Sequence, residues 1–243
     1  MLKILIPLAG SSELFEKAGY NYPKPLIEIK GKPMIQWVVE SVNNIPTPFQ
    51  FIFIIKESDV HKYHLDNTLK LLAPDSQIVK LKNETNGGLC SVLMAADLIS
   101  ENDSILILNS DQIINTNLEE VNHFWKSMDS DAGVITIQSV HPRWSYILKD
   151  GNEVIQTAEK NPISRDAIAG YYYFRSAELF FDYAYRTILN DTSVNGLFYI
   201  SSVINEFILN NKKVNYYQIE NNNYYSFYSP KLVQEFENMI NGK

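Results

Sequence analysis

Residues 3–12 read KILIPLAGSS, and residues 19–29 read GYNYPKPLIEI. A short apolar run ended by small residues, then a lysine between two prolines, predicts a buried first strand leading into a phosphate-binding loop. Small residues let backbone N–H groups approach phosphate oxygens, and the prolines restrict the backbone around the lysine. The alternative is an ordinary surface loop with a solvated lysine. The expected phosphate-binding residues are Leu8, Ala9, Gly10, Ser11, Ser12 and Lys24.

Composition limits the class of protein. A chain of 243 residues that is 45% hydrophobic allows one sizeable core, so we expect a single domain. Its 21 basic and 28 acidic residues give a net charge of −7, which argues against a nucleic-acid or anionic-membrane surface. The single cysteine, Cys90, excludes an internal disulfide. Without a signal-peptide pattern or a long apolar run, we expect a cytoplasmic protein.

Strand and helix patterns alternate through residues 1–130, the half in which we expect the nucleotide to bind. This alternation predicts a doubly wound α/β sheet whose ligand site lies beyond the carboxyl ends of the strands. After the first strand, the expected strands are residues 51–55, 77–81 and 104–108, and the expected helices are residues 33–43, 61–72 and 89–99.

Residues 131–243 have a different pattern. We expect this half to bind the second substrate, which accepts a group from the nucleotide and is called the acceptor below. The expected strands are residues 132–139, 145–148, 154–157 and 214–219, and the expected helices are residues 177–189, 200–210 and one that begins at Pro230. No linker composition separates this half as a second domain. The aromatic runs at residues 170–174 and 224–228 are typical of half-buried strand faces or of a subunit interface. A homodimer is therefore one of the alternatives.

Asp111 lies in the sequence NSDQ, residues 109–112, directly after the fourth expected parallel strand. It should therefore lie at the edge of the sheet where the N-terminal loop also emerges. Mg²⁺ prefers oxygen ligands and often takes one or two protein carboxylates, with water and substrate phosphate completing its shell. We expect Asp111 to bind Mg²⁺. A turn or helix-capping role is the alternative.

Asn86, Gly87 and Gly88 precede the expected helix at residues 89–99. Two glycines allow a backbone to lie close to a flat nucleobase, and peptide N–H and C=O groups can read the edge of that base. We expect these three residues to bind the nucleotide. A plain flexible turn is the alternative.

The N-terminal stretch resembles a known family. The sequence IPLAG at residues 6–10, Phe15, and PKPLIEIKGKPMI at residues 23–35 are similar to the signature of sugar-phosphate nucleotidyltransferases, most of all the branch found among bacterial capsule and surface-polysaccharide genes. The resemblance implies a single-domain glycosyltransferase-A-like, Rossmann-like fold with a mixed, mostly parallel sheet. It also implies the reaction: a sugar-phosphate oxygen attacks the α-phosphorus of a nucleoside triphosphate and expels pyrophosphate, with Mg²⁺ as cofactor and Lys24 and Asp111 as catalytic residues.

The same resemblance supplies an acceptor site. In the family, the counterpart of Glu159 takes sugar hydroxyls, that of Lys160 meets the acceptor phosphate, and that of Gly170 lets the sugar approach a strand. Asn195 lies in another matching segment, residues 194–199, where contact with the acceptor and a helix-entry turn are equal alternatives. The segment at residues 143–146 also matches the branch, and we assign it to packing near the expected hairpin.

Two departures from the family pattern leave other functions open. Leu14 stands where the family has an arginine that grips the departing phosphates, and Ser226 stands where it has a second metal-binding aspartate. One alternative is therefore a catalytically impaired relative that binds a nucleotide or sugar phosphate as a regulatory or partner subunit. A glycosyltransferase of the same fold class is disfavoured, because the Asp-x-Asp sequence at residues 129–131 precedes a strand instead of following one.

Overall fold

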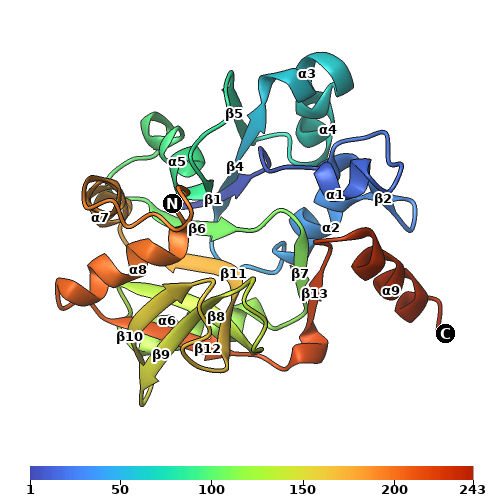
Figure 1. Ribbon diagram of the computed structural model, residues 1–243. Coiled ribbons are helices and arrows are strands. Elements are labelled where there is room, and N and C mark those ends of the chain that lie inside the picture. The colour runs from blue at the N-terminus through green and yellow to red at the C-terminus, as the bar shows by residue number, and fades with distance from the viewer. Residues whose placement is uncertain (243) are drawn as a thin grey trace.

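A nine-stranded sheet lies at the centre of the computed structural model, which describes residues 1–242 (Figure 1). In sheet order its strands are β5 (Gln77–Leu81), β4 (Phe49–Lys56), β1 (Leu2–Pro7), β6 (Ser104–Leu108), β11 (Asp166–Phe174), β8 (Ala132–Gln138), β12 (Val214–Gln218), β10 (Glu153–Glu159) and β9 (Ser145–Asp150). The neighbours β5, β4, β1 and β6 are parallel, as are β8 and β12. Strands β11 and β10 run opposite to the others. The predicted mixed, mostly parallel sheet flanked by helices is confirmed.

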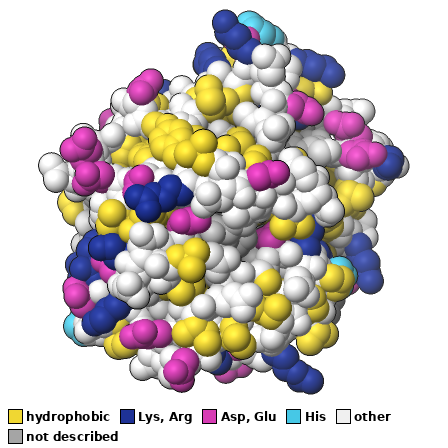
Figure 2. Space-filling model, turned by 60° about the vertical axis from the view of Figure 1, so that its left-hand side comes forward, with side chains coloured by type: hydrophobic (Ala, Val, Ile, Leu, Met, Phe, Trp, Pro, Cys, Tyr) yellow, Lys and Arg dark blue, Asp and Glu magenta, His cyan; other side chains and the backbone are white. Residues whose placement is uncertain are grey.

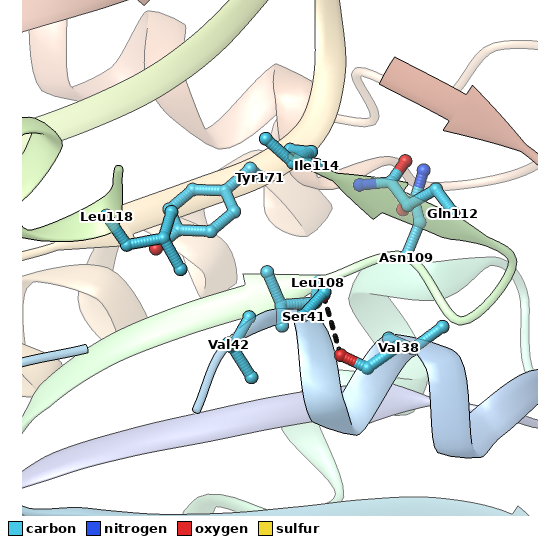
Figure 3. A pocket seen from close by; sticks show the side chains of 9 residues that line it. All are labelled: Val38, Ser41, Val42, Leu108, Asn109, Gln112, Ile114, Leu118 and Tyr171. Carbon is cyan, nitrogen blue, oxygen red and sulfur yellow. Dashed lines mark hydrogen bonds between the residues drawn. The ribbon is translucent and has the colours of Figure 1, made fainter. Parts of the chain in front are cut away.

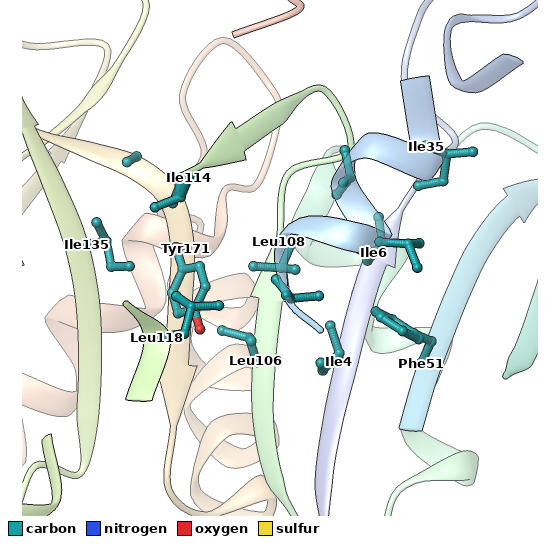
Figure 4. Close-up of a cluster of buried hydrophobic side chains, with 14 of the residues drawn as sticks. Ile4, Ile6, Ile35, Phe51, Leu106, Leu108, Ile114, Leu118, Ile135 and Tyr171 are labelled. Carbon is teal, nitrogen blue, oxygen red and sulfur yellow. The ribbon is translucent and has the colours of Figure 1, made fainter. Parts of the chain in front are cut away.

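The apolar strands bury both faces of the sheet, because successive side chains of a strand point to opposite sides. On β1, Ile4 and Ile6 belong to one core and Leu5 belongs to the other. Figure 4 shows part of the first core, with Phe51 of β4 and Leu106 of β6 beside the β1 isoleucines. These strands therefore form a rigid platform whose carboxyl ends carry the loops described below.

Two helical layers cover these faces. Helices α2 (Met34–Ser41), α4 (Leu65–Leu72) and α6 (Leu118–Ser127) contribute to the first core. Helices α5 (Gly88–Leu93), α7 (Ala177–Leu189) and α8 (Ile200–Leu209) contribute to the second core. The remaining helices are α1 (Glu13–Glu16), α3 (Glu57–Tyr63), α9 (Pro230–Ile240) and three 3₁₀ helices at Lys24–Leu26, Ala96–Leu98 and Asn221–Asn223.

A third, smaller core joins the C-terminal helix α9 to the N-terminal loop. Phe227 and Phe236 pack with Phe15 and Ile27, and the rings of Phe227 and Phe236 are 5.0 Å apart. Figure 1 shows α9 beside α1 and the short hairpin of β2 (Glu28–Ile29) and β3 (Lys32–Pro33). Residues far apart in the sequence are thereby held at the same end of the sheet.

Several elements differ from their expected form. The expected helix at residues 61–72 is two helices, α3 and α4, because His64 between them has a left-handed backbone with φ of 54°. The helix expected at residues 89–99 ends at Leu93, and the 3₁₀ turn Ala96–Leu98 follows. The hairpin β2–β3, helix α6 and strand β7 (Gln112–Ile114) were not expected as elements. Strands β11 and β13 (Tyr224–Ser226) were expected only as aromatic strand faces, and the pairing of β13 with β7 was not expected.

Charge is evenly distributed over the surface in view. Figure 2 shows Lys and Arg side chains interspersed with Asp and Glu on that face. Among residues 1–242, no helix is both long and apolar enough to cross a membrane.

Candidate functional site

Lys24 and Asp111 meet at the carboxyl ends of the parallel strands. The 3₁₀ turn Lys24–Leu26 places Lys24, and the turn between β6 and β7 places Asp111. Lys24 Nζ lies 2.8 Å from Asp111 Oδ2, and the two side chains are only 16% and 17% exposed. A paired, largely shielded lysine and carboxylate can hold opposite charges in a fixed position next to a bound phosphate.

The N-terminal loop supports Lys24 from the other side. The backbone N–H of Lys24 donates to Ser12 Oγ at 2.9 Å, and Ser11 Oγ accepts from the N–H of Glu13 at 3.2 Å. Leu8 is buried and its N–H donates to the Ile54 carbonyl, so it extends strand β1 instead of facing a ligand. The exposed residues of the predicted phosphate-binding loop are thus Gly10 and Ser11, with Ser12 half-buried.

A cleft of about 390 Å³ opens next to Asp111. From the first half of the chain it is lined by Pro7, Gly88, Asn109 and Asp111, at the ends of β1 and β6 and the start of α5. The lining residues from the second half are Arg143, Trp144, Ser145, Glu159, Lys160, Ile168, Tyr172, Tyr199, Ile200, Tyr224, Ser226 and Tyr228. Both halves of the chain therefore contribute to one cavity.

Glu159 and Lys160 lie at the end of β10 and line this cleft. The Glu159 carboxylate accepts hydrogen bonds from the hydroxyls of Ser145 and Ser201. Lys160 Nζ donates to the Tyr199 hydroxyl at 2.6 Å, and this hydrogen bond raises the pKa of the ammonium. The charged lysine and the anchored carboxylate are suited to binding a phosphate and hydroxyl groups.

The C-terminal strand β13 closes the cleft next to Asp111. Ser226 pairs with Gln112, and the Phe227 N–H donates to the Asp111 carbonyl at 2.7 Å. The Tyr224 hydroxyl donates to Gln112 Oε1 at 3.1 Å, and burial raises the pKa of that tyrosine far above its usual value. Ser226 and Asp111 therefore line the same cleft from neighbouring, paired segments.

Comparison with known proteins shows the family of this chain. Residues 18–226 match the protein family described as nucleotidyl transferase. The chain belongs to the nucleotidyl transferase family. Two curated relatives are named bifunctional protein GlmU: that of Methanocaldococcus jannaschii is 30% identical over 172 residues, and that of Thermosipho melanesiensis is 30% identical over 153 residues. The alignments cover 70% and 62% of this chain but only 39% and 31% of those proteins.

Solved structures of the same fold cover nearly the whole of this nucleotidyl transferase. A nucleoside-diphosphate-sugar pyrophosphorylase from Vibrio cholerae RC9 superposes with a TM-score of 0.81 at 27% identity, covering 97% of this chain and 99% of the other. A UDP-glucose pyrophosphorylase in complex with UDP-glucose superposes with a TM-score of 0.78 at 18% identity, covering 100% and 99% of the two chains. The second similarity is one of fold alone.

Gly87 and Gly88 of this nucleotidyl transferase have different structural roles. Gly87 has φ of +107°, and a Cβ there would overlap the backbone of Phe198, which donates its N–H to the Asn86 carbonyl at 2.8 Å. Gly88 lines the cleft with nothing within 4 Å of its Cβ position. The chain's own backbone therefore requires glycine at position 87, and the binding of a base by Gly87 and Gly88 stays a prediction.

Gly170 and Asn195 also lie elsewhere than expected. Gly170 does not line the cleft, because the side chains of Asn109 and Gln112 occupy the position where its Cβ would lie. A glycine at position 170 therefore makes room for the Asn109 and Gln112 side chains, which flank Asp111 in the sequence, and its contact with a sugar stays a prediction. Asn195 is exposed in a tight turn with φ of 54°, where Val194 and Leu197 exchange backbone hydrogen bonds, so the turn explains this residue.

Gly170→Ala is expected to destabilise the protein more than Gly151→Ala. Both glycines have left-handed backbones, with φ of +59° and +54°, so both variants carry a strain of about 1–2 kcal/mol. Only at Gly170 does a Cβ collide with neighbouring atoms, which adds about 1–3 kcal/mol. Urea unfolding measures the difference, and equal losses for the two variants would show that Asn109 and Gln112 do not require this glycine.

Arg143 and Trp144 were assigned to packing near the hairpin, but both line the cleft. The hairpin β9–β10 begins next to them, and the Lys160 N–H donates to the Trp144 carbonyl at 3.0 Å. An arginine followed by a tryptophan at the start of a strand could have indicated a place in the cleft, because arginine seldom occupies an apolar packing position without a partner. Tyr199 and Tyr228 were likewise missed as cleft residues.

The residues around Asp111 suit Mg²⁺ only in part. Among residues 1–242, no group of three or more His, Cys, Asp or Glu side chains is arranged to hold a metal ion. Asp111 and Ser226 both line the cleft and carry oxygen donors, and Mg²⁺ commonly completes its shell with water and substrate phosphate. This donor set fits Mg²⁺ that arrives with a triphosphate.

Two other features do not form a reaction site. Asp129 pairs with Arg175 at 2.7 Å, and Asp131 accepts the Lys213 N–H at 2.9 Å, so both carboxylates of the Asp-x-Asp sequence have structural partners. A closed gap of about 10 Å³ beneath Asn109 and Gln112 is lined mainly by apolar side chains (Figure 3). It is too small for a substrate.

Proposed function

We propose that this nucleotidyl transferase transfers a nucleoside monophosphate from a nucleoside triphosphate to a sugar 1-phosphate or related phosphate compound, and releases pyrophosphate. The product would be an activated sugar or similar compound for capsule or surface polysaccharide synthesis. The observation that carries the proposal is the 2.8 Å contact of Lys24 with Asp111 at a cleft that Glu159 and Lys160 also line. Triphosphate and acceptor would thus meet in one cavity.

Each of these residues has a separate task in the proposal. Lys24 holds the triphosphate with a charge-assisted hydrogen bond, and Lys160 holds the acceptor phosphate so that its oxygen faces the α-phosphorus. Glu159, held by two serine hydroxyls, accepts hydrogen bonds from acceptor hydroxyls. The new bond joins an acceptor oxygen to the α-phosphorus, and the bond that breaks releases pyrophosphate.

Asp111 would hold Mg²⁺ together with oxygens of the triphosphate. When bound, the ion neutralises charge on the phosphates and so favours attack on the α-phosphorus. The pairing of Asp111 Oδ2 with Lys24 leaves its other oxygen for this role.

The test is pyrophosphate release in the presence of Mg²⁺, across ATP, CTP, GTP and UTP combined with a panel of sugar 1-phosphates and alcohol phosphates. The proposal predicts release that requires both substrates. Tight binding of a triphosphate without release for any acceptor would favour the second candidate, a catalytically impaired relative. That candidate is favoured by Leu14, an exposed leucine on α1, and by Ser226, because neither supplies a charge to the phosphates.

Ser226→Asp is expected to tighten Mg²⁺ binding about tenfold, because the variant would add a second carboxylate to the cleft that Asp111 lines. Without metal the two carboxylates repel each other, so the variant should unfold at a lower temperature than the unmodified chain and regain stability with Mg²⁺. Ser229→Asp, three residues along and outside the cleft, is the control. Calorimetric titration showing the same Mg²⁺ affinity for all three proteins would place Ser226 away from the metal.

A further inference from the structure

Arg143 is a cation that the proposed reaction does not yet use. It lines the cleft together with Glu159 and Lys160, and its side chain is half-buried. Among the described residues 1–242, no carboxylate forms an ion pair with it, and its Nε is buried without a hydrogen-bond partner. Because a shielded charge with no partner is costly, such an arginine needs an explanation.

Aromatic rings fix the position of this guanidinium. Its Cζ lies 4.5 Å from the centre of the Trp144 ring and 5.4 Å from that of Tyr228. Trp144 in turn packs edge-on against Tyr224 with ring centres 5.5 Å apart, and Tyr224 donates to Gln112, the residue after Asp111. A guanidinium stacked on rings keeps its in-plane N–H groups available, in a geometry that matches the two oxygens of a carboxylate or phosphate.

We propose that Arg143 is a specificity-determining residue that binds an anionic group of the acceptor. This inference rests on the proposed function, because it names the acceptor class of the same cleft. The anionic group has two possible sources on one molecule: the phosphate that reacts, or a second acidic substituent such as a sugar carboxylate. In either case a neutral sugar without phosphate is excluded as an acceptor.

The neighbours of Arg143 connect it with the proposed acceptor residues. The residue comes from the second half of the chain and lines the cleft together with Lys160, whose N–H donates to the carbonyl of the neighbouring Trp144. The triphosphate loop and Lys24 belong to the first half. Arg143 and Lys160 therefore both come from the half of the chain that supplies the proposed acceptor residues, and titration with a triphosphate tests whether Arg143 meets the pyrophosphate instead.

The experiment is calorimetric titration of the full chain with three probes: inorganic phosphate, glucose 1-phosphate and glucuronic acid 1-phosphate. Arg143→Gln should weaken binding of at least one probe about 10-fold to 100-fold. Equal weakening for both sugar phosphates assigns Arg143 to the reacting phosphate, and weakening only for the glucuronate assigns it to the second acidic group. Arg143→Lys keeps the charge but loses the planar fork, so its affinity should fall in between.

Arg186→Gln, an exposed arginine paired with Asp182 on α7, is the matched control and should bind every probe normally. Thermal unfolding first establishes that each variant is folded; if Arg143→Gln is not, the comparison is made with Arg143→Lys. The proposal is overturned if the folded variants bind all probes as the unmodified chain does, if that chain binds none of them, or if Arg143→Gln weakens triphosphate binding as much as acceptor binding. Because these titrations need no turnover, their outcome is independent of whether pyrophosphate is released.

Discussion

Asp111→Asn is expected to lower Mg²⁺-dependent pyrophosphate release roughly a thousandfold or more, since a metal ion contributes several kcal/mol of charge stabilisation to such a reaction. Asparagine has nearly the same shape and can still accept a hydrogen bond from Lys24, and the backbone contact between Asp111 and Phe227 is retained. The folded structure should therefore persist. Steady-state rates, measured over a range of Mg²⁺ concentrations, and the thermal unfolding temperature together test this expectation.

A matched control is Asp66→Asn. Asp66 is another half-shielded aspartate, paired with Lys80 at 2.9 Å on the outer helix α4. It should leave turnover unchanged. If Asp111→Asn turns over as fast as the Asp66 variant, the assignment of Asp111 to the metal is wrong.

Lys24→Ala is expected to reduce turnover about 100-fold to 1,000-fold, as removal of one well-placed donor to a developing phosphate charge does in other enzymes. Two effects combine, because the triphosphate loses a cation and the largely shielded Asp111 carboxylate loses its partner. Triphosphate affinity should fall more than acceptor affinity, since Lys24 belongs to the N-terminal loop. Titration with each substrate separately distinguishes the two losses.

Lys17→Ala provides the comparison for that experiment. Lys17 lies on the same loop, but it is 72% exposed and pairs only with Glu13. Pairs of this kind contribute little, so the variant should behave like the unmodified chain. Equal loss of triphosphate and acceptor affinity in Lys24→Ala would contradict the place given to this lysine.

The sheet was predictable because its strands are continuous apolar runs. Strand Ser104–Leu108 has the bounds expected from the sequence. The rule that ligand sites lie at the carboxyl ends of parallel strands predicted that Asp111 lies near the loop that carries Lys24, although 87 residues separate the two. Such inferences depend only on burial and chain direction. The sequence carries both in its hydrophobic pattern.

Other features depend on contacts that leave no periodic pattern. Strands β7 and β13 have three residues each, so the pairing that brings Ser226 to Asp111 has no signature in either segment. The break at His64 arises from a backbone conformation unusual for a non-glycine residue. The family pattern predicts that Gly170 contacts a ligand. Only the structure shows that the Asn109 and Gln112 side chains occupy the position where a Cβ of residue 170 would lie.

Arg143 shows the same limit at the candidate site. Its neighbours in sequence suggest a packed segment next to a hairpin. The rings that hold it, Trp144 and Tyr228, lie 84 residues apart, and the absence of an acidic partner is a property of the three-dimensional arrangement among the described residues 1–242. Sequence spacing could not supply either fact.

The most direct test of nucleotidyl transfer in this cleft follows the acceptor's phosphate oxygens. A sugar 1-phosphate that supports pyrophosphate release would be labelled with ¹⁸O on its phosphate and incubated with the matching triphosphate and Mg²⁺, and the products analysed by mass spectrometry. Attack by the acceptor oxygen on the α-phosphorus predicts that all label stays in the nucleoside-diphosphate product and none enters pyrophosphate. Label in pyrophosphate, or no product from any pair of substrates, would contradict the account.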